Sequence, residues 1–137
     1  MRFMIIVKAT KDSEAGVMPQ ARLLAAMAGY HEALAKAGVL LDGAGLQPSS
    51  KGWRVQYRGA QRGIVDGPFS ETRELIAGYT LIQVRSREEA MEWVRRFPAP
   101  MGEGQDAEIE VRQLFETEDF EPGPAIDRVR QMDETRG

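Results

Sequence analysis

The feature that most constrains what this chain can fold into is a pair of amphipathic helical patterns, each lying between strand-like stretches. The first covers residues 19–37, and it is bounded by Pro19, which suits a first helical position, and by Gly38, which suits a left-handed exit. At about 100° per residue its apolar side chains share one face: Leu23, Met27, Tyr30 and Leu34. A helix with one apolar face needs a second layer to cover it.

The second helical pattern covers residues 86–98. Ser86 and Glu89 form a capping box at its start, and Pro98 stops it. The apolar positions follow the i, i+3, i+4, i+7 spacing of a buried helix face: Ala90, Trp93, Val94 and Phe97.

Strand patterns fill most of the remaining chain. The first strand is rich in Ile, Val, Phe and Met, the second is interrupted by Gly43 and Gly45, and a hairpin follows it. A polar loop is expected at 10–19 and a short helical turn, ended by Gly78, at 70–75. The predicted strands are 2–9, 39–49, 53–59, 62–67, 79–84 and 107–116.

The order of these elements predicts an α+β fold. Without the extra hairpin it reads βαββαβ, the ferredoxin-like split βαβ unit. Such a sheet carries both helices on one face, so its other face needs a cover. We expect a second copy of the same sheet to supply it, because isologous dimers are the commonest assemblies.

Composition narrows the class of protein further. The chain has 137 residues, which suits one domain, and no cysteine, which excludes disulfides, thiolate zinc sites and thiol nucleophiles. Its net charge is −3, with basic and acidic residues mixed, so no nucleic-acid partner is expected. No stretch approaches the ~18 apolar residues of a membrane span, and the start lacks signal-peptide features. We therefore expect a cytoplasmic protein without membrane partners.

The end of the chain differs from the rest. The stretch from Thr117 is acidic and contains proline and glycine, with a weak helical pattern at Ile126, Val129 and Met132. We expect a domain at 1–116 and a C-terminal tail at 117–137 that is partly helical or packed on the dimer partner.

His31 is the only histidine, and it lies at the edge between the core face and the solvent face of the first helix. Because imidazole titrates near neutral pH, His31 is a candidate general acid or base. An edge histidine without a functional role is the competing interpretation.

Asp66 precedes Gly67 and Pro68 at the end of a predicted strand. These neighbours shape the backbone, so the carboxylate is held rigidly. It could orient a histidine, as the third member of a catalytic triad does. The alternative is an Asx-type turn, in which the side chain binds local backbone N–H groups.

Four further residues are candidate substrate-binding groups. Asp42 stands beside two glycines, although a turn residue would look the same. Arg54 and Arg112 lie on strands and could bind an anionic group, although a solvated strand face explains them equally well. Phe69 has no purely structural necessity in its turn.

Motifs for cofactors and metals are missing. No P-loop, no G-x-G-x-x-G before a helix and no G-x-S-x-G elbow occurs, and Ser70 and Ser86 read as helix starts. One histidine without cysteine leaves only carboxylates as metal ligands, and their spacing shows no motif. We expect neither a cofactor nor a metal.

The run DGPFSETRELIAGY, with AGVLLDGAGLQPS before it and SREEAMEWVRRFP and EIEVRQL after it, resembles the DGPF-domain branch of the YCII-related family. The resemblance covers residues 1 to about 116. It implies a ferredoxin-like fold of the dimeric α+β barrel kind, and a histidine and an aspartate that face a shared pocket. These carry over to His31 and Asp66. Genes of this branch often neighbour extracytoplasmic-function sigma factors.

The leading hypothesis is a small dimeric enzyme-like protein, a lyase or hydrolase acting on a small metabolite. His31 would be the base, oriented by Asp66. The alternative is a non-catalytic regulator that binds a ligand or a partner, with association to a sigma factor. In a third interpretation the Asp66 turn serves folding only.

Overall fold

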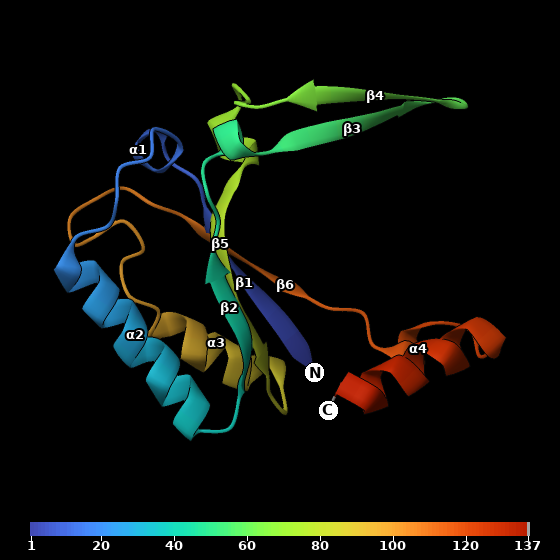
Figure 1. The fold of residues 1–137 in the computed structure, drawn as a ribbon. Helices are drawn as coiled ribbons and strands as arrows, with labels where there is room; N and C mark the ends of the chain where they lie inside the picture. Colours follow the sequence, from blue (N-terminus) through green and yellow to red (C-terminus); the bar gives the residue numbers. More distant parts are fainter. Residues whose placement is uncertain (137) are drawn as a thin grey trace.

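A four-stranded antiparallel sheet carries two long helices on one face (Figure 1). The computed structural model describes residues 1–136. The sheet consists of β1 (Arg2–Lys8), β2 (Leu40–Gly45), β5 (Ile76–Gln83) and β6 (Ile109–Gln113), in the order β2-β5-β1-β6. The helices are α2 (Ala21–Lys36) and α3 (Arg87–Arg95).

This strand order is that of the split βαβ unit, in which each helix crosses over one intervening strand. Helix α2 joins β1 to β2, and helix α3 joins β5 to β6. All neighbouring strands run antiparallel. The prediction of an α+β, ferredoxin-like fold with an extra hairpin is therefore confirmed.

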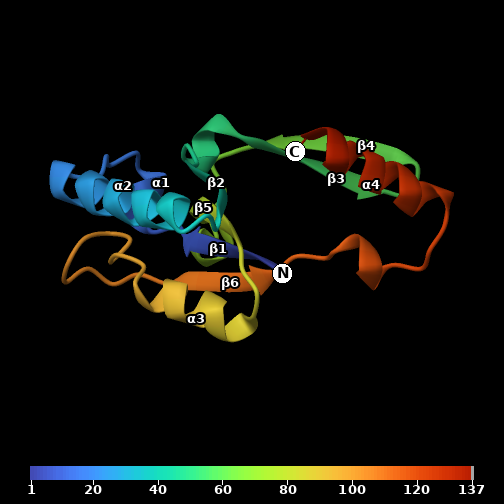
Figure 2. The same ribbon diagram turned by 90° about the horizontal axis from the view of Figure 1, so that it is seen from below.

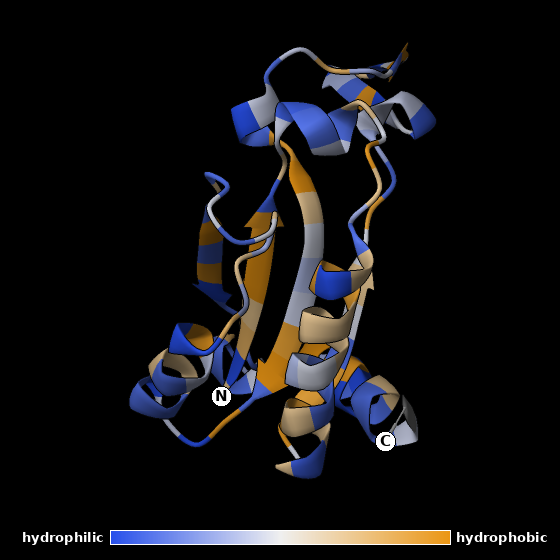
Figure 3. Ribbon diagram, turned by 90° about the vertical axis from the view of Figure 1, so that its left-hand side faces the viewer, coloured by the Kyte–Doolittle hydropathy of each residue, from blue (hydrophilic) through white to orange (hydrophobic). Residues whose placement is uncertain are grey.

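The core lies between the helices and the sheet. Alternate residues of a strand face opposite sides, and Ile5 of β1 and Ile82 of β5 point to the helices with no exposed surface. Leu34 of α2 is equally buried. Seen from the helix side, the strands between α2 and α3 are largely hydrophobic (Figure 3). Each such burial contributes roughly 1.5–3 kcal/mol, so these contacts hold the layers together.

Tyr30 connects the two helices. Its hydroxyl donates a 2.7 Å hydrogen bond to the backbone carbonyl of Trp93, and its ring meets those of Trp93 and Phe97 edge to face. Burial raises the pKa of Tyr30 to about 12, although the positive charge of Arg96 acts in the opposite direction. The neutral phenol is therefore the form that the core accepts.

The N-terminal segment differs from the sequence prediction. The expected polar loop contains a short helix, α1 (Lys11–Glu14), which is held by reciprocal capping between Thr10 and Ser13. The next helix begins at Ala21, so Pro19 precedes it. Side-chain hydrogen bonds to the backbone thus stabilise a short helix whose sequence has no hydrophobic periodicity.

Gly78 has a different role from the one expected. It does not end a helical turn, because β5 begins at Ile76 and the turn η2 (Thr72–Glu74) ends earlier. A Cβ atom on Gly78 would lie 2.9 Å from the carbonyl oxygen of Ala44 in β2. The glycine therefore allows two strands to approach closely.

A second, two-stranded sheet projects from the body (Figure 1). It consists of β3 (Trp53–Arg58) and β4 (Gln61–Asp66), preceded by the short helix η1 (Ser49–Lys51). Every residue of both strands is exposed. The extra hairpin is therefore an arm and not part of the core sheet.

The C-terminal segment forms a second arm. The turn η3 (Thr117–Asp119) leads to the helix α4 (Pro124–Arg136), which extends on the same side of the sheet as the hairpin (Figures 1 and 2). The two arms lie at opposite ends of the sheet in Figure 1. The sheet face between them, called the open face below, is the one that α2 and α3 do not cover.

The close approach of the strands at Gly78 can be tested with a glycine-to-alanine substitution there and at a control position. We expect Gly78→Ala to lower the free energy of unfolding by about 1–3 kcal/mol, because the methyl group meets the β2 backbone. Gly29→Ala is the control: its Cβ would have nothing within 4 Å in α2, so we expect stabilisation by up to about 1 kcal/mol. Urea unfolding measures both, and an unchanged stability of Gly78→Ala would contradict the close approach.

The buried phenol predicts a loss of stability in alkali. Above pH 10 the unfolded chain releases the Tyr30 proton, whereas the folded chain holds it until about pH 12. Unfolding therefore becomes more favourable by about 1.4 kcal/mol per pH unit in this window. Urea unfolding at pH 9, 10 and 11 should show a shallower pH slope for Tyr30→Phe than for the wild type. Equal slopes would contradict the burial of an ionisable phenol.

Candidate functional site

His31 lies between helix α2 and the sheet, where both of its ring nitrogens have partners. Nδ1 is 2.8 Å from the backbone carbonyl oxygen of Met27, one helical turn earlier. Nε2 is 2.8 Å from the hydroxyl oxygen of Thr80, a residue of β5 that is almost fully buried. The histidine thus ties the helix to the central strands.

The partners determine how the ring is protonated. A carbonyl oxygen only accepts, so Nδ1 carries the hydrogen that is donated to Met27. In the neutral ring Nε2 is then the acceptor for the Thr80 hydroxyl. The buried hydroxyl of Thr80 and the imidazole therefore satisfy each other.

Gly43 of β2 makes room for this ring. A Cβ atom at position 43 would lie 3.0 Å from Nε2 of His31. The glycine that the sequence suggested as a bulge or a site of close approach is therefore the place where the imidazole packs on the sheet edge.

Asp66 lies elsewhere, at the end of β4 and opposite Trp53 in the hairpin. Its side chain is exposed and makes no hydrogen bond or ion pair within residues 1–136. The structure of a single chain therefore forms neither the hydrogen bond between His31 and Asp66 nor the Asx-type turn. The catalytic roles of the two residues stay predictions.

Gly67 and Phe69 form the joint between the hairpin and the body. A Cβ atom on Gly67 would lie 1.8 Å from the carbonyl oxygen of Ser49, so no other residue fits. The N–H of Phe69 donates to the hydroxyl of Ser49, which itself donates to the carboxylate of Glu14. The DGPF run thus anchors the hairpin to η1 and α1.

Arg54 and Phe69, two of the predicted substrate-binding residues, lie together. The guanidinium carbon of Arg54 is 3.8 Å from the centre of the Phe69 ring. A cation–π contact at an exposed site contributes about 0.5–1 kcal/mol. The phenylalanine therefore has a structural partner at the base of the hairpin.

Asp42 forms the best-defined polar pair on the open face. Its carboxylate accepts a 3.0 Å hydrogen bond from the hydroxyl of Tyr79 and a 2.8 Å hydrogen bond from the N–H of Gly43. The hydrogen bond to Asp42, together with the negative charge of Asp42, raises the pKa of Tyr79. No sequence motif singled out Tyr79 as a site residue, although strand alternation places it on the face opposite Thr80.

Arg112 stands at the other edge of the same face. The strand registers align Asp42, Leu81, Met4 and Arg112 in one row across the four strands. Three strand spacings separate the ends of this row, about 14 Å between Cα atoms. The guanidinium of Arg112 also lies 3.2 Å from the carboxylate of Glu110. An exposed pair of this kind contributes little to stability, so another anion can compete for the arginine.

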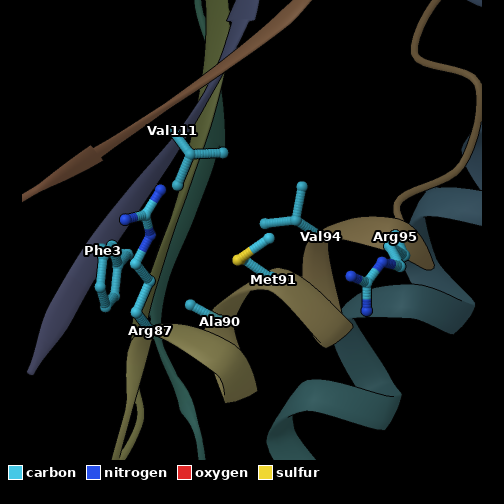
Figure 4. Close-up of a pocket in the computed structure, with 7 residues that line it drawn as sticks. All are labelled: Phe3, Arg87, Ala90, Met91, Val94, Arg95 and Val111. Carbon is cyan, nitrogen blue, oxygen red and sulfur yellow. The ribbon is translucent and has the colours of Figure 1, made fainter.

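A separate cavity of about 270 Å³ lies on the helix side of the sheet (Figure 4). Its walls are mainly apolar, with two arginines. None of the catalytic or substrate-binding residues predicted from the sequence lines it, so the cavity does not unite them. It is lined by Phe3, Arg87, Ala90, Met91, Val94, Arg95 and Val111.

Among residues 1–136, no group of three or more histidine, cysteine, aspartate or glutamate side chains is placed to hold a metal ion. No helix in that range is long and apolar enough to cross a membrane.

Comparison with known proteins identifies the family. A family model for the YCII-related domain matches residues 1–117. It does not distinguish the DGPF-domain branch, which stays a prediction. No curated protein matches the sequence significantly.

One similar solved structure is the 5-chloro-2-hydroxyhydroquinone dehydrochlorinase TftG from Burkholderia phenoliruptrix AC1100, in complex with 2,5-dihydroxybenzoquinone. It is 16% identical, with a TM-score of 0.46, and the alignment covers 84% of this chain and 94% of that one.

The structural role of His31 can be tested at its partner. Thr80→Val keeps the shape of the side chain but leaves Nε2 of His31 without a hydrogen bond, so we expect a loss of about 1–3 kcal/mol in the free energy of unfolding. Thr80→Ser keeps the hydroxyl and is the control. Should Thr80→Val be at least as stable as Thr80→Ser in urea, His31 would not tie the helix to the sheet.

Proposed function

Because the chain belongs to the YCII-related domain family, we propose that it acts as a homodimeric, enzyme-like protein that binds a small metabolite on the open face of its sheet. One observation carries the proposal. The Asp42–Tyr79 pair stands on a sheet face that α2 and α3 do not cover, next to an apolar floor. A polar pair at the edge of an apolar surface is typical of small-molecule sites.

A second copy of the chain is the cover that we propose for this face. The apolar side chains Met4, Ile6 and Leu81 on it are only partly buried within one chain. Antiparallel sheets commonly bury one such face against a second layer. Burying a charged carboxylate away from water costs free energy, so the edge of the face at Asp42 stays open to water or to a ligand.

The row across the face indicates the ligand class. Arg112 would bind an anionic group, and the Asp42–Tyr79 pair would accept the hydrogen of a hydroxyl group. The ligand would lie between the two stacked sheet faces, with Leu81 and Met4 against its apolar middle. The fitting ligand is a small hydroxylated carboxylate.

Within this site Asp42 is the proposed base. Tyr79 already donates to one carboxylate oxygen, so its own oxygen can accept a hydrogen bond from the hydroxyl of the ligand. The ligand proton would pass to the Tyr79 oxygen while Tyr79 passes its own proton to Asp42, which leaves a neutral carboxyl group and a ligand alkoxide. Proton abstraction from that hydroxyl is a first step open to a lyase or a hydrolase.

His31 and Asp66 have a different place in this proposal. Both nitrogens of His31 already have partners within one chain, so it serves as a positioning residue for α2. Catalysis by His31 with Asp66 as its orienting group would require a rearrangement of these contacts.

Ligand stabilisation tests the site. We expect small hydroxylated carboxylic acids to raise the thermal midpoint of the wild type. At a ligand concentration a hundred times the dissociation constant, the folded state gains about 2.7 kcal/mol. The same compounds as amides, or without the hydroxyl group, should stabilise much less. Asp42→Asn, Tyr79→Phe and Arg112→Gln should each weaken ligand affinity about tenfold or more, as the loss of one charged hydrogen bond does. Each variant should therefore show a smaller thermal shift than the wild type at the same ligand concentration.

Matched controls separate the site from general charge effects. Asp106→Asn and Arg22→Gln remove the same charges from an exposed loop and from an exposed position of α2, so they should leave the ligand shift unchanged. If Asp42→Asn and Asp106→Asn respond alike, the open face is not the binding site.

A second candidate function is a non-catalytic regulator that binds a ligand or a partner, including an extracytoplasmic-function sigma factor. The exposed aromatic side chains of the hairpin favour it, because large apolar groups in water mark interaction sites. Co-purification with a sigma factor that is lost in Trp53→Ala, while Asp42→Asn has no effect on ligand binding, would support this candidate over the enzyme.

A further inference from the structure

One face of the β3–β4 hairpin exposes apolar side chains that its own chain leaves largely uncovered. Trp53, Tyr57 and Ile64 are 65%, 67% and 71% exposed. Register places them on one side, since Val55 pairs with Ile64 and Tyr57 with Arg62. A two-stranded hairpin is at best marginally stable alone in water, so this face needs a partner.

The helix α4 has the same deficit. Its apolar side chains Ile126, Val129 and Met132 follow one stripe, and Val129 and Met132 are exposed. A shallow groove runs along this stripe from Ala125 to Thr135. Helices of this length are marginal in water without packing, so the apolar stripe of α4 also needs a packing partner.

The arrangement of the two arms indicates what the partner is. Both extend from the same side of the sheet, and they start at its opposite ends (Figures 1 and 2). A two-fold rotation that stacks two open faces and exchanges their ends brings the hairpin of one copy to α4 of the other. The contact then occurs twice, as a symmetric dimer requires.

Charge supports this pairing. The hairpin, residues 53–66, contains three arginines and one aspartate. The C-terminal tail, residues 117–137, contains six acidic side chains and three arginines, and its acidic excess lies in residues 118–121, just before α4. Two hairpins brought together would repel each other, whereas a hairpin and an acidic tail attract.

We propose that α4 of each copy packs its apolar stripe on the Trp53 face of the partner's hairpin. The proposal rests on the dimer of the proposed function and goes beyond it, because sheets can stack without exchange of the tails. It explains why both arms leave large apolar side chains exposed within one chain.

Cysteine cross-linking tests the exchange directly, because the chain has no cysteine of its own. Full-length Val55→Cys and Val129→Cys variants are mixed, allowed to exchange subunits, and treated with a short thiol-to-thiol cross-linker. We expect a covalent dimer from the mixture and far less from either variant alone. Gln105→Cys, on an exposed loop, mixed with Val55→Cys, is the control that should not cross-link.

A second measurement uses the fluorescence of Trp53, isolated by subtracting the spectrum of Trp53→Phe. Met132→Glu places a charge in the proposed contact. We expect it to shift the Trp53 emission to the red and to raise the dimer dissociation constant about tenfold or more. Gln105→Glu adds the same charge elsewhere and should change neither.

The outcomes separate this proposal from the dimer itself. A stable dimer without the mixed cross-link, and with unchanged Trp53 emission in Met132→Glu, overturns the exchange and leaves the dimer standing. A monomer in sedimentation overturns both. Cross-linking of Val55→Cys to itself also overturns the exchange, since two hairpins would then pair. So does an intramolecular cross-link in a chain that carries both Val55→Cys and Val129→Cys, since α4 would then fold back on its own hairpin.

Discussion

The whole structure depends on one asymmetry: a four-stranded antiparallel sheet has two faces, and α2 and α3 cover only one of them. The apolar contacts of Ile5, Leu34 and Ile82 make the covered face the stable core. The other face keeps its apolar floor partly in water, and both arms of the chain extend on that side. The accessibility of the Asp42–Tyr79 pair and the proposed dimer both follow from the lack of a second layer on this face.

The histidine illustrates how packing decides chemistry. A histidine at the edge of a helix can act as a catalytic base or can link the helix to a neighbouring strand, and the sequence did not decide between these roles. In the structure, Met27 and Thr80 take both ring nitrogens, and Gly43 gives the ring its space. Asp42 and Tyr79, which do face open space, instead form the pair from which acid–base chemistry is proposed. A carboxylate beside a phenol on an uncovered face is accessible to a ligand, whereas the imidazole is not free to exchange its partners without loosening α2.

Most of the fold was predictable because hydrophobic period and capping are local. The stripe with Tyr30 and Leu34 identified the helix face, and Ser86 marked the start of α3. The errors lie where side chains bind the backbone or where two strands approach: the capped α1, and Gly78 within β5. Of the site residues, the arginine and the phenylalanine of the Arg54–Phe69 contact were both singled out, but their contact was not foreseen. Tyr79 was missed because an aromatic residue in a strand is ordinarily a core residue.

The sequence by itself determined the order of strands and helices, the βαββαβ fold and the family, since these depend on patterns within short windows. Only the tertiary structure decided which polar residues meet. The distance between His31 and Thr80 in the chain, or between Asp42 and Tyr79, is tens of residues, and strand register sets whether such side chains share a face. A one-residue slip would turn every side chain of β5 to the opposite face, so register, which is a property of the assembled sheet, determines the chemistry of this protein.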